Sequence, residues 1–304
     1  MAGSPRKERS DRYTVLDLQS EFPTDDACLN WLWRHLHSAD GQIAYCPKCD
    51  RERRFHRVKS RNSYSCDSCG HHIHPTADTI FHKSTTPLRL WFHAIFLMSQ
   101  TRCGISARQV QREIGVTYKT AWRMCQQIRS MLEEDEGPLG GEGVAVEADE
   151  MYVGGKAREY PKRTRAEHRA RKVPVFGAVE RGGRIVAKVM PDTRAVRGNL
   201  MSYVLPTSRL YTDDANVYTG LEMELTYRDH HRIAHYTKVY VDGDVHTQTI
   251  DGFFALVKNA IRGVHHGVSR DHLQRYLDEF TFRYNHRDDG EPMFKLFLRR
   301  VCPS

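Results

Sequence analysis

The sequence has no long hydrophobic run. No apolar stretch approaches the roughly 18 residues that a membrane-spanning helix needs, and the polar start MAGSPRKERSDRY has no apolar segment of the kind found in signal peptides. There is also no internal repeat, which excludes a solenoid or other repeat architecture. We therefore expect a non-repetitive cytoplasmic protein, and its 304 residues are enough for about two or three domains.

Half of the cysteines are concentrated in one place. Of eight cysteines, four are scattered and four form two CxxC pairs, Cys46 with Cys49 and Cys66 with Cys69. In a reducing compartment such pairs favour metal binding over disulfides. Two thiolates on one tight turn reach the same ion, and two such turns complete a tetrahedron. The spacing predicts a structural zinc ion in a zinc ribbon; the alternative is a chance cluster of buried thiols.

Net negative charge is also missing. The chain has 46 Lys and Arg against 38 Asp and Glu, a formal charge of +8. A basic balance favours a polyanionic partner, above all nucleic acid, although an ordinary basic soluble protein has the same composition. A basic insertion at residues 156–172 has two readings of equal weight: a solvated loop, or a DNA-tracking segment in which Arg163 and Arg165 contact phosphates.

Residues 105–132 have the pattern of a helix-turn-helix. Ser106 begins the first helix with a capping box, Gly115 occupies the turn, and Thr117 begins the second helix. Such helix pairs also serve as plain packing units, but a neighbouring zinc ribbon and a basic chain favour DNA binding. The side chains expected on the outer surface to contact DNA are Lys119, Arg123 and Arg129.

An acidic, glycine-rich stretch separates this region from a second domain with an α/β pattern. It is followed by runs that alternate like strands and then by runs with helical spacing. The expected organisation is an N-terminal helical segment (1–40), a zinc ribbon (41–80), a helix-turn-helix region (85–132), a linker (133–143) and a catalytic domain (144–304).

Carboxylates recur at three places in the second domain. Asp149 lies within an expected strand, Asp213 and Asp214 lie at the end of another, and Asp251 lies near the start of a helix. Acids on separate elements suit magnesium, which prefers oxygen ligands. Phosphodiester chemistry commonly uses two such ions in one site. Helix caps and surface charges are the alternative explanation.

Four segments together, DEMYVGGK, YTDDANVY, HTQTIDGFFALVK and HLQRYLDEFTFRYNHR, resemble bacterial insertion-sequence transposases of the ISXO2-like group. The resemblance covers most of the chain. It implies a ribonuclease-H-like catalytic domain, a mixed sheet flanked by helices, preceded by a small zinc ribbon and a helix-turn-helix. It also implies magnesium, or manganese in its place, for DNA cleavage and strand transfer. The implied partners are terminal inverted repeats, target DNA and a second copy of the chain, because two DNA ends must be joined.

The resemblance also assigns site residues. Asp149 matches the first family Asp, Asp213 the second, and Lys258 a basic residue seven positions after the third. At the third position the family's Asn and Glu are replaced by Gln248 and Asp251, which keep an amide oxygen and a carboxylate. The neighbouring acid Glu150 is expected on the opposite face of the strand, as a salt-bridged structural acid. The rival readings are an inactive transposase that acts as a DNA-binding regulator, and a different nuclease or resolvase on the same fold.

Overall fold

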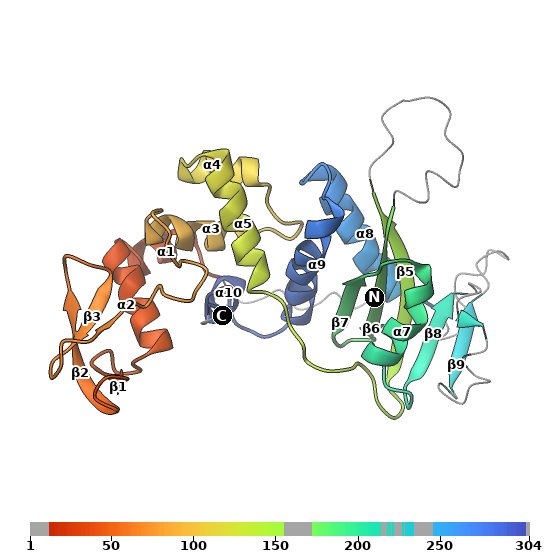
Figure 1. The fold of residues 1–304 in the computed structure, drawn as a ribbon. Helices are drawn as coiled ribbons and strands as arrows, with labels where there is room; N and C mark the ends of the chain where they lie inside the picture. The colour runs from red at the N-terminus through yellow and green to blue at the C-terminus, as the bar shows by residue number, and fades with distance from the viewer. Residues whose placement is uncertain are drawn as a thin grey trace. The chain divides into compact units, whose positions relative to one another are not determined.

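The computed structural model describes residues 12–154, 172–213, 218–219, 221, 227, 229–233 and 246–301. The chain forms two compact units (Figure 1), one of Met1–Leu132 with Asp289–Ser304 and one of Glu133–Asp288. Each unit is described by itself. In the described part of the chain, no helix combines the length and the apolar character required to cross a bilayer.

The first unit begins with two helices that threonines cap. The helix α1 (Val15–Glu21) has a capping box between Thr14 and Asp17, and in α2 (Asp25–Leu36) the side chain of Thr24 accepts a hydrogen bond from the N–H of Ala27. Such caps satisfy N–H groups that have no partner inside the helix. The buried face of α2 includes Trp33, whose ring stacks on Tyr64 of the following sheet at 4.2 Å between centroids. The helix therefore supplies much of the core of that small sheet.

That sheet is a four-stranded antiparallel ribbon. Its strands follow the order of the sequence, β1 (Ile43–Cys46), β2 (Arg51–Val58), β3 (Ser63–Cys66) and β4 (His72–Ile73). The first CxxC pair spans the turn after β1 and the second spans the turn after β3. The pairing of β1 with β2 and of β2 with β3 brings the two turns to one end of the ribbon.

Three further helices of the first unit are α3 (Leu88–Gln100), α4 (Ala107–Ile114) and α5 (Tyr118–Ser130). The capping and turn residues expected from the sequence are present. Ser106 caps α4, Gly115 ends it in a left-handed conformation with φ of 70°, and Thr117 caps α5. A glycine is suited to that position because it has no Cβ.

The C-terminal helix α10 (Met293–Arg299) also belongs to the first unit. The ring of Phe294 packs against Phe96 of α3, with 5.8 Å between centroids, and Lys295 pairs with Glu21 of α1. The sequence predicts a catalytic domain that runs to residue 304, whereas the second unit of the structure ends at Asp288. The difference arises because the apolar face of α10 is buried against α3.

The second unit is built on a five-stranded mixed sheet in the order β7-β6-β5-β8-β9. Its members are β5 (Ala145–Val153), β6 (Val173–Glu180), β7 (Ile185–Val189), β8 (Arg209–Asp213) and β9 (His230–Ile233). The strands β5, β6 and β7 pair antiparallel, whereas β8 runs parallel to β5 and β9 parallel to β8. A further strand predicted at 235–244 lies outside the described residues.

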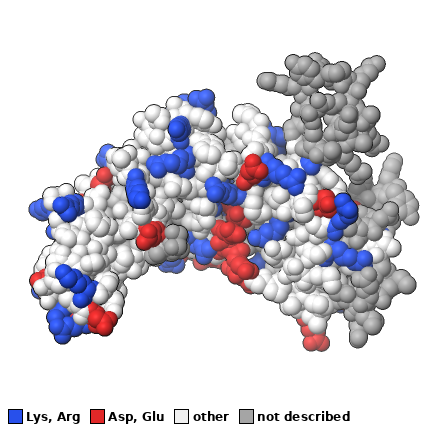
Figure 2. All heavy atoms as spheres, viewed as in Figure 1, with Lys and Arg blue, Asp and Glu red and all other residues white. Residues whose placement is uncertain are grey.

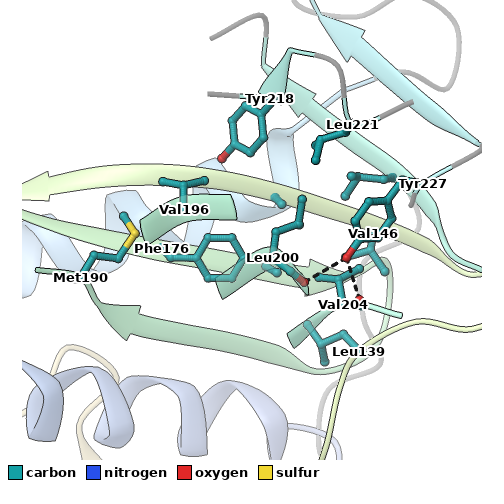
Figure 3. Packing of buried hydrophobic residues seen from close by; sticks show 13 residues of the cluster. Leu139, Val146, Phe176, Met190, Val196, Leu200, Val204, Tyr218, Leu221 and Tyr227 are labelled. Carbon is teal, nitrogen blue, oxygen red and sulfur yellow. Dashed lines mark hydrogen bonds between the residues drawn. The ribbon is translucent and has the colours of Figure 1, made fainter. Parts of the chain in front are cut away.

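Helices cover the sheet. The short turn η2 (Thr193–Ala195) leads into α7 (Val196–Tyr203), which packs on one face around Val146, Phe176 and Leu200 (Figure 3). Figure 3 also shows the hydroxyl of Tyr227 donating to the carbonyls of Leu200 and Val204. These bonds tie the C-terminal end of α7 to the buried Tyr227.

Two further helices in the described part of this unit are α8 (Gln248–Gly263) and α9 (Arg270–Asn285). Side chains of α9 cover the open edge of β7: Gln274 bonds the N–H of Val189 and the carbonyl of Ala187, and Asn285 bonds both backbone groups of Ile185. Unpaired strand edges promote aggregation, so these amides both satisfy and protect the sheet.

Candidate functional site

The carboxylates of β5 and β8 converge because the two strands are parallel neighbours. In their register Ala148 lies opposite Thr212, so the next residues, Asp149 and Asp213, lie side by side on one face of the sheet. One carboxylate oxygen from each of Asp149, Glu150 and Asp213 lies within 4.8 Å of the other two. Hard divalent cations take oxygen ligands, so this group has the chemistry to hold one.

The electrostatics of Asp149 reflect this crowding. Partial burial raises the pKa of its carboxyl group to about 8, with further contributions from the negative charges of Asp213, Glu150 and Asp251. Charges of one sign at close range disfavour ionisation. A cation placed among these oxygens would reverse the balance, and the donor set therefore fits a divalent metal.

Glu150 has a place in this group that the alternation of the strand does not predict. Its partner Tyr218 lies in the core on the α7 side of the sheet, and the Tyr218 hydroxyl donates to Glu150 Oε2 at 3.0 Å. The sequence favours a salt-bridged structural acid on that opposite face. In the structure one of its oxygens nevertheless reaches the group formed with Asp149 and Asp213.

The candidate ligands of α8 lie in its first turn. Gln248 and Asp251 are both exposed, and the hydroxyl of Thr247 donates to Asp251 Oδ2 at 3.3 Å. Asp251 is outside the three-membered carboxylate group, but its charge acts on the Asp149 carboxyl. Lys258 follows two turns later, half-buried, with its ammonium 5.8 Å from the centre of the Phe254 ring.

Sequence reasoning gives no role to Glu147, which is fully buried. Its carboxylate bonds Arg181 and the first turn of α8. The alternation of β5 was the available signal, because it places Glu147 on the same face as Asp149. A buried carboxylate needs partners, and only the fold identifies them.

The four paired cysteines form a second cluster, in the first unit. Their sulfur atoms all lie within 4.8 Å of one another, with Cys46 and Cys69 at 3.6 Å and Cys49 and Cys66 at 4.0 Å. A tetrahedral zinc ion with bonds of about 2.3 Å separates its sulfurs by roughly 3.8 Å, so the geometry fits zinc and is far longer than a disulfide bond.

One of these thiols is already biased toward the thiolate. Burial acts to raise the pKa of Cys66, but the N–H groups of Cys69 and Ser68 outweigh it and lower the value to about 7. Burial and bonds to the other three sulfurs raise the pKa of Cys69 on the same turn. Thiolates are the form that binds zinc, so a bound cation would be needed to ionise both thiols together.

The residues expected to contact DNA have different environments. Lys119 and Arg123 are exposed on α5, with Arg123 stacked over Trp91 at 5.7 Å. Figure 2 shows Lys and Arg spread over the visible face of the first unit. Arg163 and Arg165 lie outside the described residues.

Arg129 is a correction: it is predicted on the outer surface, but only 1% of its surface is exposed. The reason is helical geometry, since Ala121, Cys125 and Arg129 follow one another at intervals of four residues and Ala121 and Cys125 are buried. The side chain therefore lies on the packed face of α5, where it cannot contact DNA.

Comparison with known proteins gives three findings. The family model described as ISXO2-like transposase domain matches residues 138–285. An uncharacterized protein in transposable element ISH50 of Halobacterium salinarum is 31% identical over 272 residues, which cover 84% of this chain and 90% of the relative. The crystal structure of a pre-cleavage Mos1 transpososome aligns with 64% of this chain and 72% of that chain, at 13% identity and a TM-score of 0.24, too low to bear on the fold.

Proposed function

The chain belongs to the ISXO2-like transposase family, and from that premise we propose that it is a DNA transposase that cleaves DNA at element ends and transfers the strands into target DNA. The observation that carries the proposal is the convergence of Asp149, Glu150 and Asp213 on two parallel strands. The mixed sheet flanked by helices supports a ribonuclease-H-like catalytic domain, with the cysteine ribbon and helix pair as the DNA-binding part.

The roles of the chain's own residues follow from their positions. Asp149 and Asp213 would hold a divalent cation, with Asp251 and Gln248 reaching it from α8. Magnesium or manganese, when bound, supplies positive charge that activates an attacking hydroxyl and offsets the charge on the departing oxygen. Lys258, on the same helix as Asp251, would contact a DNA phosphate. Because two element ends must be joined, we expect a dimer or larger oligomer on DNA.

The central test is single-turnover cleavage of a labelled terminal-repeat duplex across a magnesium titration. Magnesium-dependent nicking followed by joining of 3′ ends to target DNA is the expected result. Ends that are released but never joined would favour a nuclease or resolvase instead. A protein that binds the repeats and never cuts them would favour the inactive, regulatory alternative.

We expect the charge of Asp251 to matter more than the length of its side chain. Asp251→Asn should abolish cleavage, Asp251→Glu should keep or improve it, and Gln248→Ala should have an intermediate effect, because a hard cation prefers a carboxylate over an amide. The measurement is the cleavage rate at several magnesium concentrations. If Asp251→Asn cleaved like the parent, this acid would be only a helix-terminal charge.

Arg123 and Arg129 form a matched pair on one helix. We expect Arg123→Ala to weaken terminal-repeat binding about tenfold and to reduce the salt dependence of binding, because a lost DNA contact costs about 1–3 kcal/mol. Arg129→Ala should lower the free energy of unfolding by about 2 kcal/mol or more, because it empties a buried site, and should leave binding unchanged. Electrophoretic mobility shifts at several salt concentrations, with thermal unfolding alongside, measure both. The reverse pattern would place the DNA interface elsewhere.

A further inference from the structure

The buried carboxylate of Glu147 is bound directly to the start of α8. Its Oε2 accepts hydrogen bonds from the N–H groups of Thr249 and Ile250 at 2.8 and 3.1 Å, and its Oε1 accepts one from the Thr249 hydroxyl at 2.9 Å. The first N–H groups of a helix have no partner inside it, and the helix dipole favours a negative charge there. Glu147 therefore fastens α8 to the central strand across 102 residues of sequence.

Arg181 fixes the carboxylate in turn. Its Nε donates to Glu147 Oε1 at 2.8 Å, and its Nη2 donates to the carbonyl of His246 at 2.9 Å, just before α8. The guanidinium also stacks over Tyr211 of β8 at 4.2 Å. A carboxylate taken out of water is stable only when it is paired and hydrogen-bonded. Here its partners come from the turn after β6 and from the start of α8, including His246, whose Nδ1 lies 3.2 Å from Glu147 Oε1.

A second contact sets how closely α8 approaches the sheet. Gly177 lies opposite Asp149 in the register of β5 and β6. A Cβ at Gly177 would lie 2.6 Å from the ring of Phe254 and 2.9 Å from Ile250. The helix thus packs directly over Gly177, the cross-strand neighbour of Asp149, and only a glycine at position 177 leaves it room.

We propose that Glu147 is a positioning residue of the carboxylate site: it holds the first turn of α8 so that Asp251 and Gln248 reach a divalent cation bound by Asp149 and Asp213. This inference rests on the proposed function. The carboxylate oxygens of Glu147 already accept hydrogen bonds from Thr249, Ile250 and Arg181, so Glu147 acts through the helix rather than as a metal ligand.

Glu147→Gln tests this role, because glutamine keeps the shape and loses the charge. Loss of a residue that orients metal ligands typically costs about 10–100-fold in metal affinity, and we expect about tenfold weaker Mn²⁺ binding by the full-length, zinc-loaded chain. Electron paramagnetic resonance of free Mn²⁺, without DNA, gives this affinity. In cleavage assays the magnesium concentration for half-maximal rate should rise about as much, with the rate largely recovered at saturation.

Glu279→Gln is the matched control. Glu279 is also a fully buried carboxylate with an arginine partner, Arg283, but it lies on α9. We expect its replacement to reduce thermal stability and to leave Mn²⁺ affinity unchanged. Thr249→Val removes only the hydroxyl bond to Glu147. It should weaken Mn²⁺ binding about threefold, less than the loss typical when a residue that orients metal ligands is replaced. If Glu147→Gln does not fold, Thr249→Val provides the test instead.

Three results would overturn the positioning role: equal Mn²⁺ affinity in the parent, Glu147→Gln and Thr249→Val proteins, an equal loss in Glu279→Gln, or no Mn²⁺ binding by the parent. Failure of the proposed function looks different. In that case the parent cleaves no terminal-repeat DNA, while the Mn²⁺ affinities still separate Glu147→Gln from Glu279→Gln and support the positioning role.

Discussion

Replacement of Asp149 by asparagine is expected to abolish cleavage and, at the same time, to stabilise the metal-free protein. Asp149 is the carboxylate at the centre of the proposed site, next to Asp213 and Glu150. A bound metal contributes several kcal/mol to the transition state, so loss of a central ligand should slow single-turnover cleavage by at least about a thousandfold. Binding of terminal-repeat DNA should remain, because Arg123 and the helix pair proposed to hold the repeats belong to the other unit.

The gain in stability follows from the pKa of the same group. In the folded chain burial and the neighbouring acids raise the pKa of Asp149 from 3.8 to about 8. The folded state therefore keeps a proton that the unfolded state releases, and stability falls as the pH rises from about 4 to about 8. At pH 7 this costs on the order of 3 kcal/mol for a partly buried group. Asparagine cannot ionise, so its unfolding temperature at pH 8 should exceed the parent's by about 5 °C or more.

Asp278→Asn provides the control for both effects. Asp278 is buried on α9, where burial raises its pKa to about 6, and it accepts a hydrogen bond from Gln274. The stability gained by its replacement should level off above about pH 6, whereas the gain for Asp149→Asn should keep growing to about pH 8. Cleavage by Asp278→Asn should stay intact. Thermal unfolding between pH 5 and pH 8, with and without magnesium, makes the comparison. Full cleavage by Asp149→Asn would contradict the assignment. So would a difference in stability between Asp149→Asn and the parent that does not grow between pH 6 and pH 8.

The sequence predicts local structure well where one short-range signal decides it. Ser106 and Thr117 cap their helices, and Gly115 takes the left-handed conformation at the turn, as the pattern indicates. The strands β5, β6, β7 and β8 lie within runs that alternate or are continuously apolar. The convergence of Asp149 and Asp213, by contrast, requires the parallel pairing of two strands far apart in sequence. A family resemblance indicated that pairing, and the residues alone did not.

The failures have a common cause, which is that packing partners lie far away in sequence. Arg129 is charged, so composition favours the surface, but its position four residues after Cys125 places it in the core. The helix α10 looks like the end of the second domain until α3 is known to bury it. Glu147 has no visible role until Thr249 and Arg181 are placed beside it. In each case the deciding contact is tertiary.

The cysteine cluster leads to the other large expected effect. We expect the full-length chain to contain about one zinc ion, as four thiolate ligands imply, and the double replacement of Cys66 and Cys69 by serine to lose it. Atomic absorption on the purified protein measures the zinc content. Cys103→Ser is the control, because Cys103 lies outside the cluster and should keep the metal. Zinc retained by the double variant would show that these thiols do not bind it.

Loss of zinc should also unfold the ribbon, because little besides the packing of α2 then holds it together. Its four strands have two to eight residues each, and its buried hydrophobic side chains include Ala44, Phe55 and Tyr64 besides two of the cysteines themselves. Apparent zinc-binding energies of about 10–16 kcal/mol in small zinc domains are folding energies, since the site does not exist in the unfolded chain. Trp33 stacks on Tyr64, so tryptophan fluorescence should report the collapse when a chelator is added. The carboxylate unit, Glu133–Asp288, should keep its own Mn²⁺ affinity under the same treatment, because Asp149, Glu150 and Asp213 all belong to that unit.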